Sequence, residues 1–79
     1  MQSDSKLLTF EWNNADEQLE IHGSVEGLTK LRQKLDDLLS SKAPNETHLM
    51  TEEWGGEELT SEKQAESNQL VNHVKIFKW

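Results

Sequence analysis

The apolar residues of this chain change their spacing once, at Gly23-Ser24. Before that point they alternate with polar residues, as in a strand with one buried face; after it they recur every three or four residues, as on one side of an amphipathic helix. The alternating residues are Leu8, Phe10, Trp12, Leu19 and Ile21, and the helically spaced ones are Val25, Leu28, Leu31, Leu35, Leu38 and Leu39. We therefore predict strands over residues 6–12 and 18–22, joined as a hairpin by turn-forming residues 13–16, and then a helix.

The predicted helix has recognisable ends. Ser24 can accept an early backbone N–H as the N-cap, and Glu26 and Lys42 suit the two poles of the helix dipole. Ala43-Pro44 should end the helix, because proline disfavours helical geometry in the residue before it. Gly27 in the first turn costs about 1 kcal/mol relative to alanine, and close packing on the sheet is the only reason the sequence suggests for it.

The second half of the chain predicts two more strands around a polar loop. Residues 46–51 and 70–79 have strand composition, whereas residues 52–69 are rich in Glu, Ser, Gln and Asn, with room for a brief strand at 57–60. A loop of about 18 residues is unusual in so small a domain unless it has a function. The order is β-β-α-β-β: an α+β fold in which one amphipathic helix packs on one face of an antiparallel sheet of about four strands.

This arrangement predicts both the core and an uncovered face. The core should join the helix leucines to the inward-facing strand residues, namely Leu28, Leu31, Leu35, Leu38 and Leu39 with Leu8, Phe10, Leu19, Ile21, Leu49, Val74 and Ile76. The last strand then places Val71, His73, Lys75, Phe77 and Trp79 on the opposite face. Either the long loop or a partner should cover that face.

Length and residue usage narrow the class of protein. The 79 residues have room for one domain, residues 1–79, which buries roughly 60% of its unfolded surface. No cysteine is present to supplement the core with a disulfide or a thiolate metal site. Residues 1–6 do not resemble an export signal, and no run approaches the ~20 apolar residues of a membrane span. We expect a cytoplasmic protein that is not embedded in a membrane.

The charge of the chain points to a class of partner. Acidic residues outnumber basic ones by 15 to 8, and the formal net charge is −7. This balance argues against nucleic acid as a ligand and favours cationic partners. The excess gathers in residues 1–20 and in residues 46–66, where seven glutamates accompany a single lysine. The second segment coincides with the predicted loop, so we expect a cationic partner to meet the loop.

Two histidines flank the loop on the predicted strands. Strand pairing could bring His48 and His73 together on one face, with Glu52 or Glu53 nearby. Two histidines without a ligand-spacing signature are more typical of structural or surface positions than of a metal centre. We predict no metal and no cofactor.

The loop itself carries two pairs of glutamates around two glycines. Catalysis by carboxylates needs two groups whose environments separate their pKa values, and the adjacent pairs Glu52-Glu53 and Glu57-Glu58 rarely provide this in a polar loop. No nucleophile or buried pocket is evident, so we expect no enzyme; the pairs are either solvated or a surface for a cationic partner. Gly55-Gly56 lacks a following Lys-Ser/Thr and lies among glutamates that repel phosphate, so it predicts a tight turn.

Trp54, beside these glycines, is the most informative single residue. A large aromatic side chain is costly to expose in an acidic loop. One interpretation is that Trp54 covers the open face of the sheet. The other is that it anchors an interface, since tryptophan is enriched at binding hot spots.

The end of the chain resembles a known family. Residues 48–60 read His-Leu-Met-Thr-Glu-Glu-Trp-Gly-Gly-Glu-Glu-Leu-Thr, and residues 72–79 read Asn-His-Val-Lys-Ile-Phe-Lys-Trp. Both segments are similar to bacterial immunity proteins of polymorphic toxin systems, in the family numbered thirty-two. The most specific part is His-Leu-x-Thr-x-x-Trp-Gly-Gly-x-x-Leu, and the resemblance extends to the first 45 residues only in general plan.

The resemblance implies a protein that binds a cognate toxin and blocks it stoichiometrically, without catalysis. The acidic loop would then enter the cationic cleft of a nuclease-type toxin, with Trp54 as an anchor. The candidate partner-binding residues are His48, Glu52, Glu53, Trp54, Glu57, Glu58 and His73, with Gly55 and Gly56 as the turn. The alternative is a small regulatory or assembly module that forms a homodimer through the sheet face or an edge strand, so that both monomer and homodimer remain open.

Overall fold

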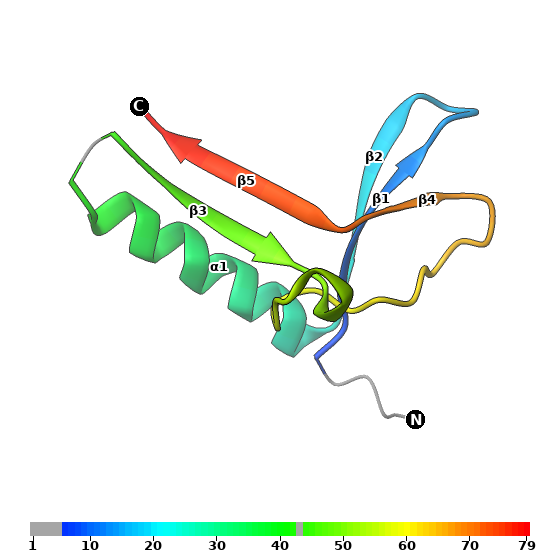
Figure 1. The fold of residues 1–79 in the computed structure, drawn as a ribbon, viewed down its shortest axis with the longest axis horizontal. Helices are drawn as coiled ribbons and strands as arrows, with labels where there is room; N and C mark the ends of the chain where they lie inside the picture. Colours follow the sequence, from blue (N-terminus) through cyan, green and yellow to red (C-terminus); the bar gives the residue numbers. More distant parts are fainter. Residues whose placement is uncertain (1–5, 43) are drawn as a thin grey trace.

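A computed structural model describes residues 6–42 and 44–79 (Figure 1). The elements are β1 (Leu8–Asn13), β2 (Gln18–Gly23), α1 (Val25–Ser40), β3 (Asn45–Met50), the 3-10 helix η1 (Glu52–Trp54), β4 (Gln69–Val71) and β5 (His73–Lys78). The α+β class and the β-β-α-β-β order are confirmed, with the last strand divided in two. The absence of an export signal, which concerns residues 1–6, and the helix stop at Ala43 are predictions that fall largely outside the described residues. Within the described part of the chain, no helix is both long and apolar enough to cross a membrane.

The strands form two antiparallel sheets instead of one. The first sheet has the order β2-β1-β4 and the second the order β3-β5. Asn72 separates β4 from β5, so the end of the chain leaves one sheet and enters the other. Thr51, which follows β3, is tied to this junction: its N–H donates to the Asn72 carbonyl at 3.0 Å, and its hydroxyl to Asn72 Oδ1 at 2.7 Å.

The core lies where the two sheets meet. Its buried residues are Leu8, Phe10, Leu49 and Leu59, with Leu31, Val71, Val74 and Ile76 packed against them. Leu59 comes from the long loop. It forms an isolated parallel β-bridge with Thr51, the residue that follows β3. Sequence patterning did not predict Leu59 as a core residue, and it placed Val71 on the opposite face. The remaining members of this core were predicted. Val71 pairs with Phe10 of β1, so the division at Asn72 moves it to the core side.

Several predicted core residues are instead exposed. Leu19 and Ile21 of β2 are 55% and 46% exposed, and Leu39 of α1 is 71% exposed. Leu28 and Leu35 of α1 are also exposed. The reason is the split of the sheet: α1 lies along β3 and β5, whereas the β1–β2 hairpin projects away from them (Figure 1). Only the end of β2 meets the helix, where the Leu28 side chain lies over Gly23.

Close packing explains the glycine in the first turn of α1. Ser24 is the N-cap, and its Oγ accepts a hydrogen bond from Gly27 N at 3.0 Å. A Cβ atom on Gly27 would stand 1.7 Å from the carbonyl oxygen of Leu7. The helix therefore begins against the backbone that leads into β1, and only glycine permits that approach.

The other end of α1 differs from the prediction. The helix ends at Ser40 with Ser41 as its C-cap, so Lys42 lies beyond it and the last turn carries no basic residue. Lys78 of β5 takes that role. Its ammonium group donates hydrogen bonds to the carbonyl oxygens of Leu39 and Ser41, which suits the negative pole of the helix.

Candidate partner-binding site

The face of the β3–β5 sheet that points away from α1 gathers aromatic and charged side chains. This open face consists of Glu46, His48, Met50, His73, Lys75 and Phe77, and the register pairs His48 with Lys75 and Met50 with His73. The two predicted histidines are brought together. His48 Nδ1 lies 2.9 Å from His73 Nε2, and the rings stack with centroids 5.2 Å apart.

A chain of polar contacts runs across the open face. Glu46 Oε2 lies 2.7 Å from His48 Nε2 and 3.8 Å from the Lys75 ammonium. The hydrogen bond with His48 lowers the pKa of the Glu46 carboxyl; burial acts in the opposite direction and is outweighed, with Lys75 adding to the lowering. Both ring nitrogens of His48 are thus engaged, one by a carboxylate and one by an imidazole, which leaves neither directed at a cation.

Trp54 borders this face at the end of η1. Its ring lies 6.1 Å from that of His73 between centroids, tilted by 47°, and 58% of the residue remains exposed. The contact with His73 agrees with the interpretation of Trp54 as a cover for the sheet face, and its role as an interface anchor stays a prediction. The ring shelters one side of His73, and most of its surface is still available for contact.

The two glycines hold η1 against the end of β3. Gly55 has φ = 89°, in the left-handed region, and its N–H donates to the Glu52 carbonyl at 2.9 Å. A Cβ atom on Gly56 would stand 2.5 Å from the Met50 carbonyl oxygen. Each glycine thus has its own steric reason, and together they set the position of Trp54.

The four loop glutamates have different surroundings. Glu52, Glu53 and Glu57 are exposed. Glu58 is partly buried, and its Oε1 accepts a hydrogen bond from Met50 N at 3.1 Å. Burial by itself would raise the pKa of Glu58, but hydrogen bonds from backbone N–H groups, together with the charge of Lys34, lower it. Glu58 therefore supports the end of β3, while the other three present their charge to solvent.

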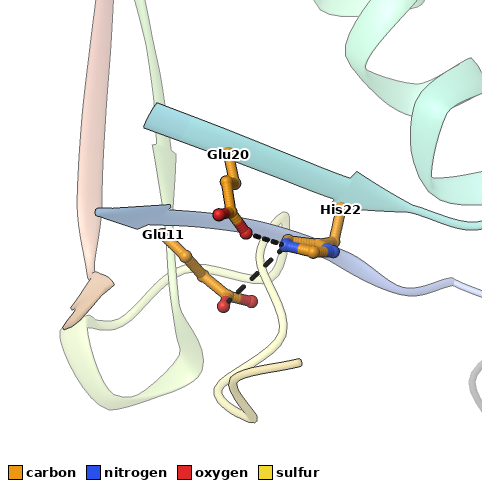
Figure 2. Close-up of side chains that lie close together, drawn as sticks. All are labelled: Glu11, Glu20 and His22. Carbon is orange, nitrogen blue, oxygen red and sulfur yellow. Dashed lines mark hydrogen bonds and ion pairs between the residues drawn. The ribbon is translucent and has the colours of Figure 1, made fainter. Parts of the chain in front are cut away.

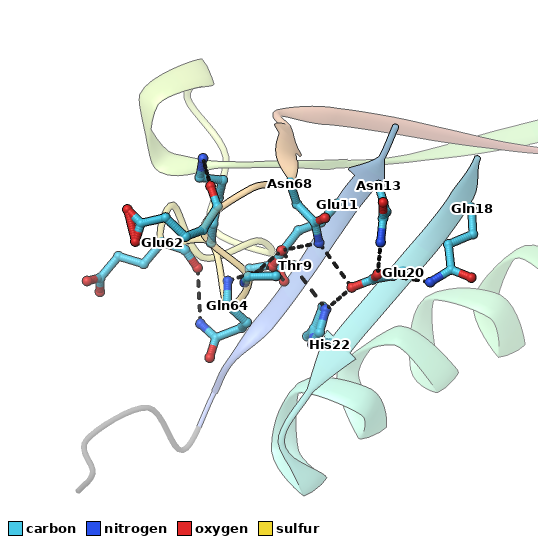
Figure 3. A network of polar contacts seen from close by, with 12 residues as sticks. Thr9, Glu11, Asn13, Gln18, Glu20, His22, Glu62, Gln64 and Asn68 are labelled. Carbon is cyan, nitrogen blue, oxygen red and sulfur yellow. Dashed lines mark hydrogen bonds and ion pairs between the residues drawn. The ribbon is translucent and has the colours of Figure 1, made fainter. Parts of the chain in front are cut away.

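Sequence reasoning missed a buried carboxylate on the other sheet. Glu11 of β1 is fully buried, and it accepts hydrogen bonds from Thr9 Oγ1 at 2.6 Å and Asn68 Nδ2 at 3.0 Å (Figure 3). The backbone N–H groups of Gln64 and Ala65 also donate to it, at 2.8 and 3.2 Å. Burial would raise the pKa of Glu11, but these hydrogen bonds outweigh it and lower the pKa to about 2. Glu11 therefore fastens the end of the long loop to β1.

Glu11 also belongs to the group that comes nearest to a metal site among the described residues. One ligand atom each from Glu11, Glu20 and His22 lies within 4.8 Å of the others (Figure 2). Glu20 Oε1 lies 2.8 Å from His22 Nε2, and Glu20 also accepts from Asn13, Gln18 and Asn68, which lowers its pKa to about 2.

These contacts describe an anchor and not a cation site. An ionised carboxylate has about four lone-pair positions, and in both glutamates four donors already occupy them. A signal for this cluster existed in the sequence. Thr9, Glu11, Glu20 and His22 alternate with the apolar residues of the first two strands, so they share the second face of that hairpin. The long loop covers that face.

A family model described as immunity protein 32 matches residues 18–74. That range runs from the start of β2 into β5 and includes η1 and the paired histidines. No curated protein and no solved structure matches the chain.

Proposed function

The chain belongs to the immunity protein 32 family, and on that premise we propose that it binds a cognate bacterial toxin domain stoichiometrically and blocks its activity. Such a role needs a complementary surface and no chemical step. The single domain of residues 1–79 would act in the cytoplasm of the cell that it protects.

The exposure of Trp54 carries the proposal. A tryptophan that is 58% exposed, fixed against His73 by a two-glycine turn, is a preformed anchor with little conformational entropy left to lose. The exposed carboxylates of Glu52, Glu53 and Glu57 lie in the same segment. An apolar ring beside a cluster of charge is the arrangement typical of a hot spot with a polar rim.

The charge of this surface supports one class of partner. We infer a cationic toxin, for which a nuclease-type domain with a phosphate-binding cleft is the natural candidate, because the exposed glutamates can occupy positions that phosphates would take. Glu58 contributes by holding the end of β3, and His48 and His73 extend the contact across the open face.

Co-expression tests the proposal directly. The polypeptide encoded next to this chain should be toxic alone, harmless when this chain is produced with it, and recoverable with it as a complex of equal stoichiometry. A neighbour that is harmless and does not bind would end the proposal. The same trial with Trp54→Ala asks whether the proposed surface, and not merely the fold, provides protection.

A further inference from the structure

The β2 strand leaves one edge of the three-stranded sheet open. It lies outermost in the order β2-β1-β4 and has six residues, Gln18–Gly23, without lysine or proline. Natural edge strands are commonly protected against pairing by such residues or by being very short. The opposite edge, β4, has only three residues, and β5 carries Lys75 and Lys78. Neither a lysine, nor a proline, nor a short length therefore protects the open edge of β2.

The register shows which backbone groups point outward. Ser24 N donates to the Leu7 carbonyl at 3.0 Å, and hydrogen-bonded pairs recur every second residue along an antiparallel ladder. Thr9 with His22 and Glu11 with Glu20 are therefore the pairs bonded to each other. Consistently, the Leu8 carbonyl accepts from Thr60 N on the far side of β1. The N–H and C=O groups of Leu19, Ile21 and Gly23 thus face the open edge.

An apolar surface lies beside this edge. Leu19 and Ile21 share one face of the sheet, because they pair with Trp12 and Phe10, and they are 55% and 46% exposed. Leu28 of α1 extends the surface: its side chain lies over Gly23, where a Cβ would stand 2.7 Å from Leu28 Cγ. Three exposed aliphatic side chains therefore line a strand edge that is ready to pair.

We propose that β2 pairs antiparallel with β2 of a second copy of this chain, with the two-fold axis at Ile21. The outward groups of Ile21 then bond to those of Ile21 in the other copy, and Leu19 lies opposite Gly23, next to Leu28. The result is a continuous sheet of six strands across two protomers, with the aliphatic surfaces side by side on the same face of that sheet.

Side-chain chemistry selects this register over its neighbour. With the axis at Ile21, Glu20 of one copy lies opposite His22 of the other, so no two carboxylates lie opposite each other. Moving the axis to Glu20 would instead place two carboxylates directly opposite, where like charges destabilise the pairing. The register with Ile21 on the axis therefore avoids this repulsion and places equivalent residues of the two copies against each other, as a two-fold interface requires.

This interface is separate from the proposed toxin surface, which lies on the other sheet, and it does not rest on the proposed function. A dimer would leave η1 and the open face of β3–β5 free in both copies. Failure of toxin binding and failure of dimerisation are consequently independent results.

A cysteine placed on the axis provides a direct test. Because the native chain has no cysteine, any disulfide that forms must involve the introduced residue. Residues opposite each other in a hydrogen-bonded antiparallel pair have Cα atoms about 5.5 Å apart, within the range of a disulfide. Purified Ile21→Cys should form a reducible covalent dimer under mild oxidation, and Leu39→Cys, exposed on α1, should not. Equal cross-linking of the two variants would overturn the proposal.

Sedimentation measures the association of the unmodified chain. We expect a dimer that dissociates on dilution, and a native chain that stays monomeric up to millimolar concentration would overturn the proposal. Ile21→Lys puts two ammonium groups on the axis and should weaken association at least tenfold, to about a tenth or less of the native affinity. The matched Leu39→Lys should associate like the native chain. If Ile21→Lys proves unfolded by circular dichroism, the cysteine pair still decides the question.

Discussion

Asn68 and Glu11 lie 57 positions apart in the chain, yet the side-chain amide of Asn68 donates a 3.0 Å hydrogen bond to the buried Glu11 carboxylate. The same amide reaches Glu20 at 3.0 Å. One residue at the end of the long loop is thereby fixed to both strands of the β1–β2 hairpin. The loop that carries η1 is closed at its far end by a carboxylate within the first sheet.

Replacing Glu11 tests this anchor. Glu11→Gln removes the charge and turns an N–H₂ group toward donors that need an acceptor, so we expect the free energy of unfolding at neutral pH to fall by about 3 kcal/mol. Chemical denaturation measures the change. Glu62→Gln, the same substitution at an exposed position of the loop, should stay within about 0.5 kcal/mol of the native value. Equal effects would remove Glu11 from the anchor.

The same carboxylate predicts an acid limb of stability. The pKa of Glu11 is lowered from 4.5 to about 2 on folding, so the unfolded chain takes up this proton at a higher pH than the folded chain. The contribution of ionised Glu11 to the free energy of unfolding is therefore complete above about pH 4.5, and it disappears as the pH falls toward 2. Glu20, whose pKa is also lowered to about 2, acts in the same direction. When chemical denaturation is repeated across this pH range, the free energy of unfolding of Glu11→Gln should fall less steeply with decreasing pH than that of the native chain.

Gly27 should tolerate no side chain. Because a Cβ would lie 1.7 Å from the Leu7 carbonyl oxygen, Gly27→Ala forces α1 away from β1. We expect a loss of about 3 kcal/mol or more, despite the higher helix propensity of alanine. Thermal unfolding measures it, with Gln33→Ala on the exposed side of α1 as the matched helix control. A stabilised Gly27→Ala variant would contradict the packing described for the start of the helix.

Trp54 should contribute to binding much more than to folding. Removing the ring exposes little core, because more than half of the residue already faces solvent. The free energy of unfolding of Trp54→Ala should therefore lie within about 1 kcal/mol of the native value. Its affinity for the cognate toxin should fall by about 2 kcal/mol or more in calorimetry. Leu39→Ala, at an even more exposed apolar position on α1, should bind normally. Unchanged binding by Trp54→Ala would place the interface elsewhere.

The loop charge should govern the rate of encounter. Glu52→Lys combined with Glu53→Lys should slow association and reduce its dependence on salt, because electrostatic steering acts chiefly on the on-rate. Asp36→Lys combined with Asp37→Lys makes the same change in net charge on exposed positions of α1. Stopped-flow kinetics should therefore separate the two variants. Identical on-rates would mean that overall charge, and not the loop, steers the partner.

Local pattern was sufficient for the first hairpin, the start of the helix and the existence of the later strands. The change of period at Gly23-Ser24 places both the hairpin and the helix, and Ser24 is the N-cap as expected. The pairing of β3 with β5 also brings His48 and His73 together as predicted. These features depend on neighbours in sequence or on alternation along one pair of strands, which a sequence displays directly.

Contacts between residues far apart in the chain could not be predicted from local pattern. The break at Asn72 splits the sheet, and nothing in residues 70–79 distinguishes one bent pair of strands from a single long one. The exposure of Leu19 and Leu39 follows from that split. The role of Glu11 depends on donors more than fifty positions away, two of which are backbone N–H groups that have no sequence signature.

That anchoring through the backbone has a consequence for how the loop can change over evolutionary time. The groups that bind Glu11 at positions 64 and 65 are peptide N–H donors, which every amino acid except proline supplies. Side chains there can be exchanged while the attachment persists, with only Thr9 and Asn68 committed by their own chemistry. Substitutions at positions 64 and 65 can therefore accumulate one at a time while the attachment of the loop to β1 is kept.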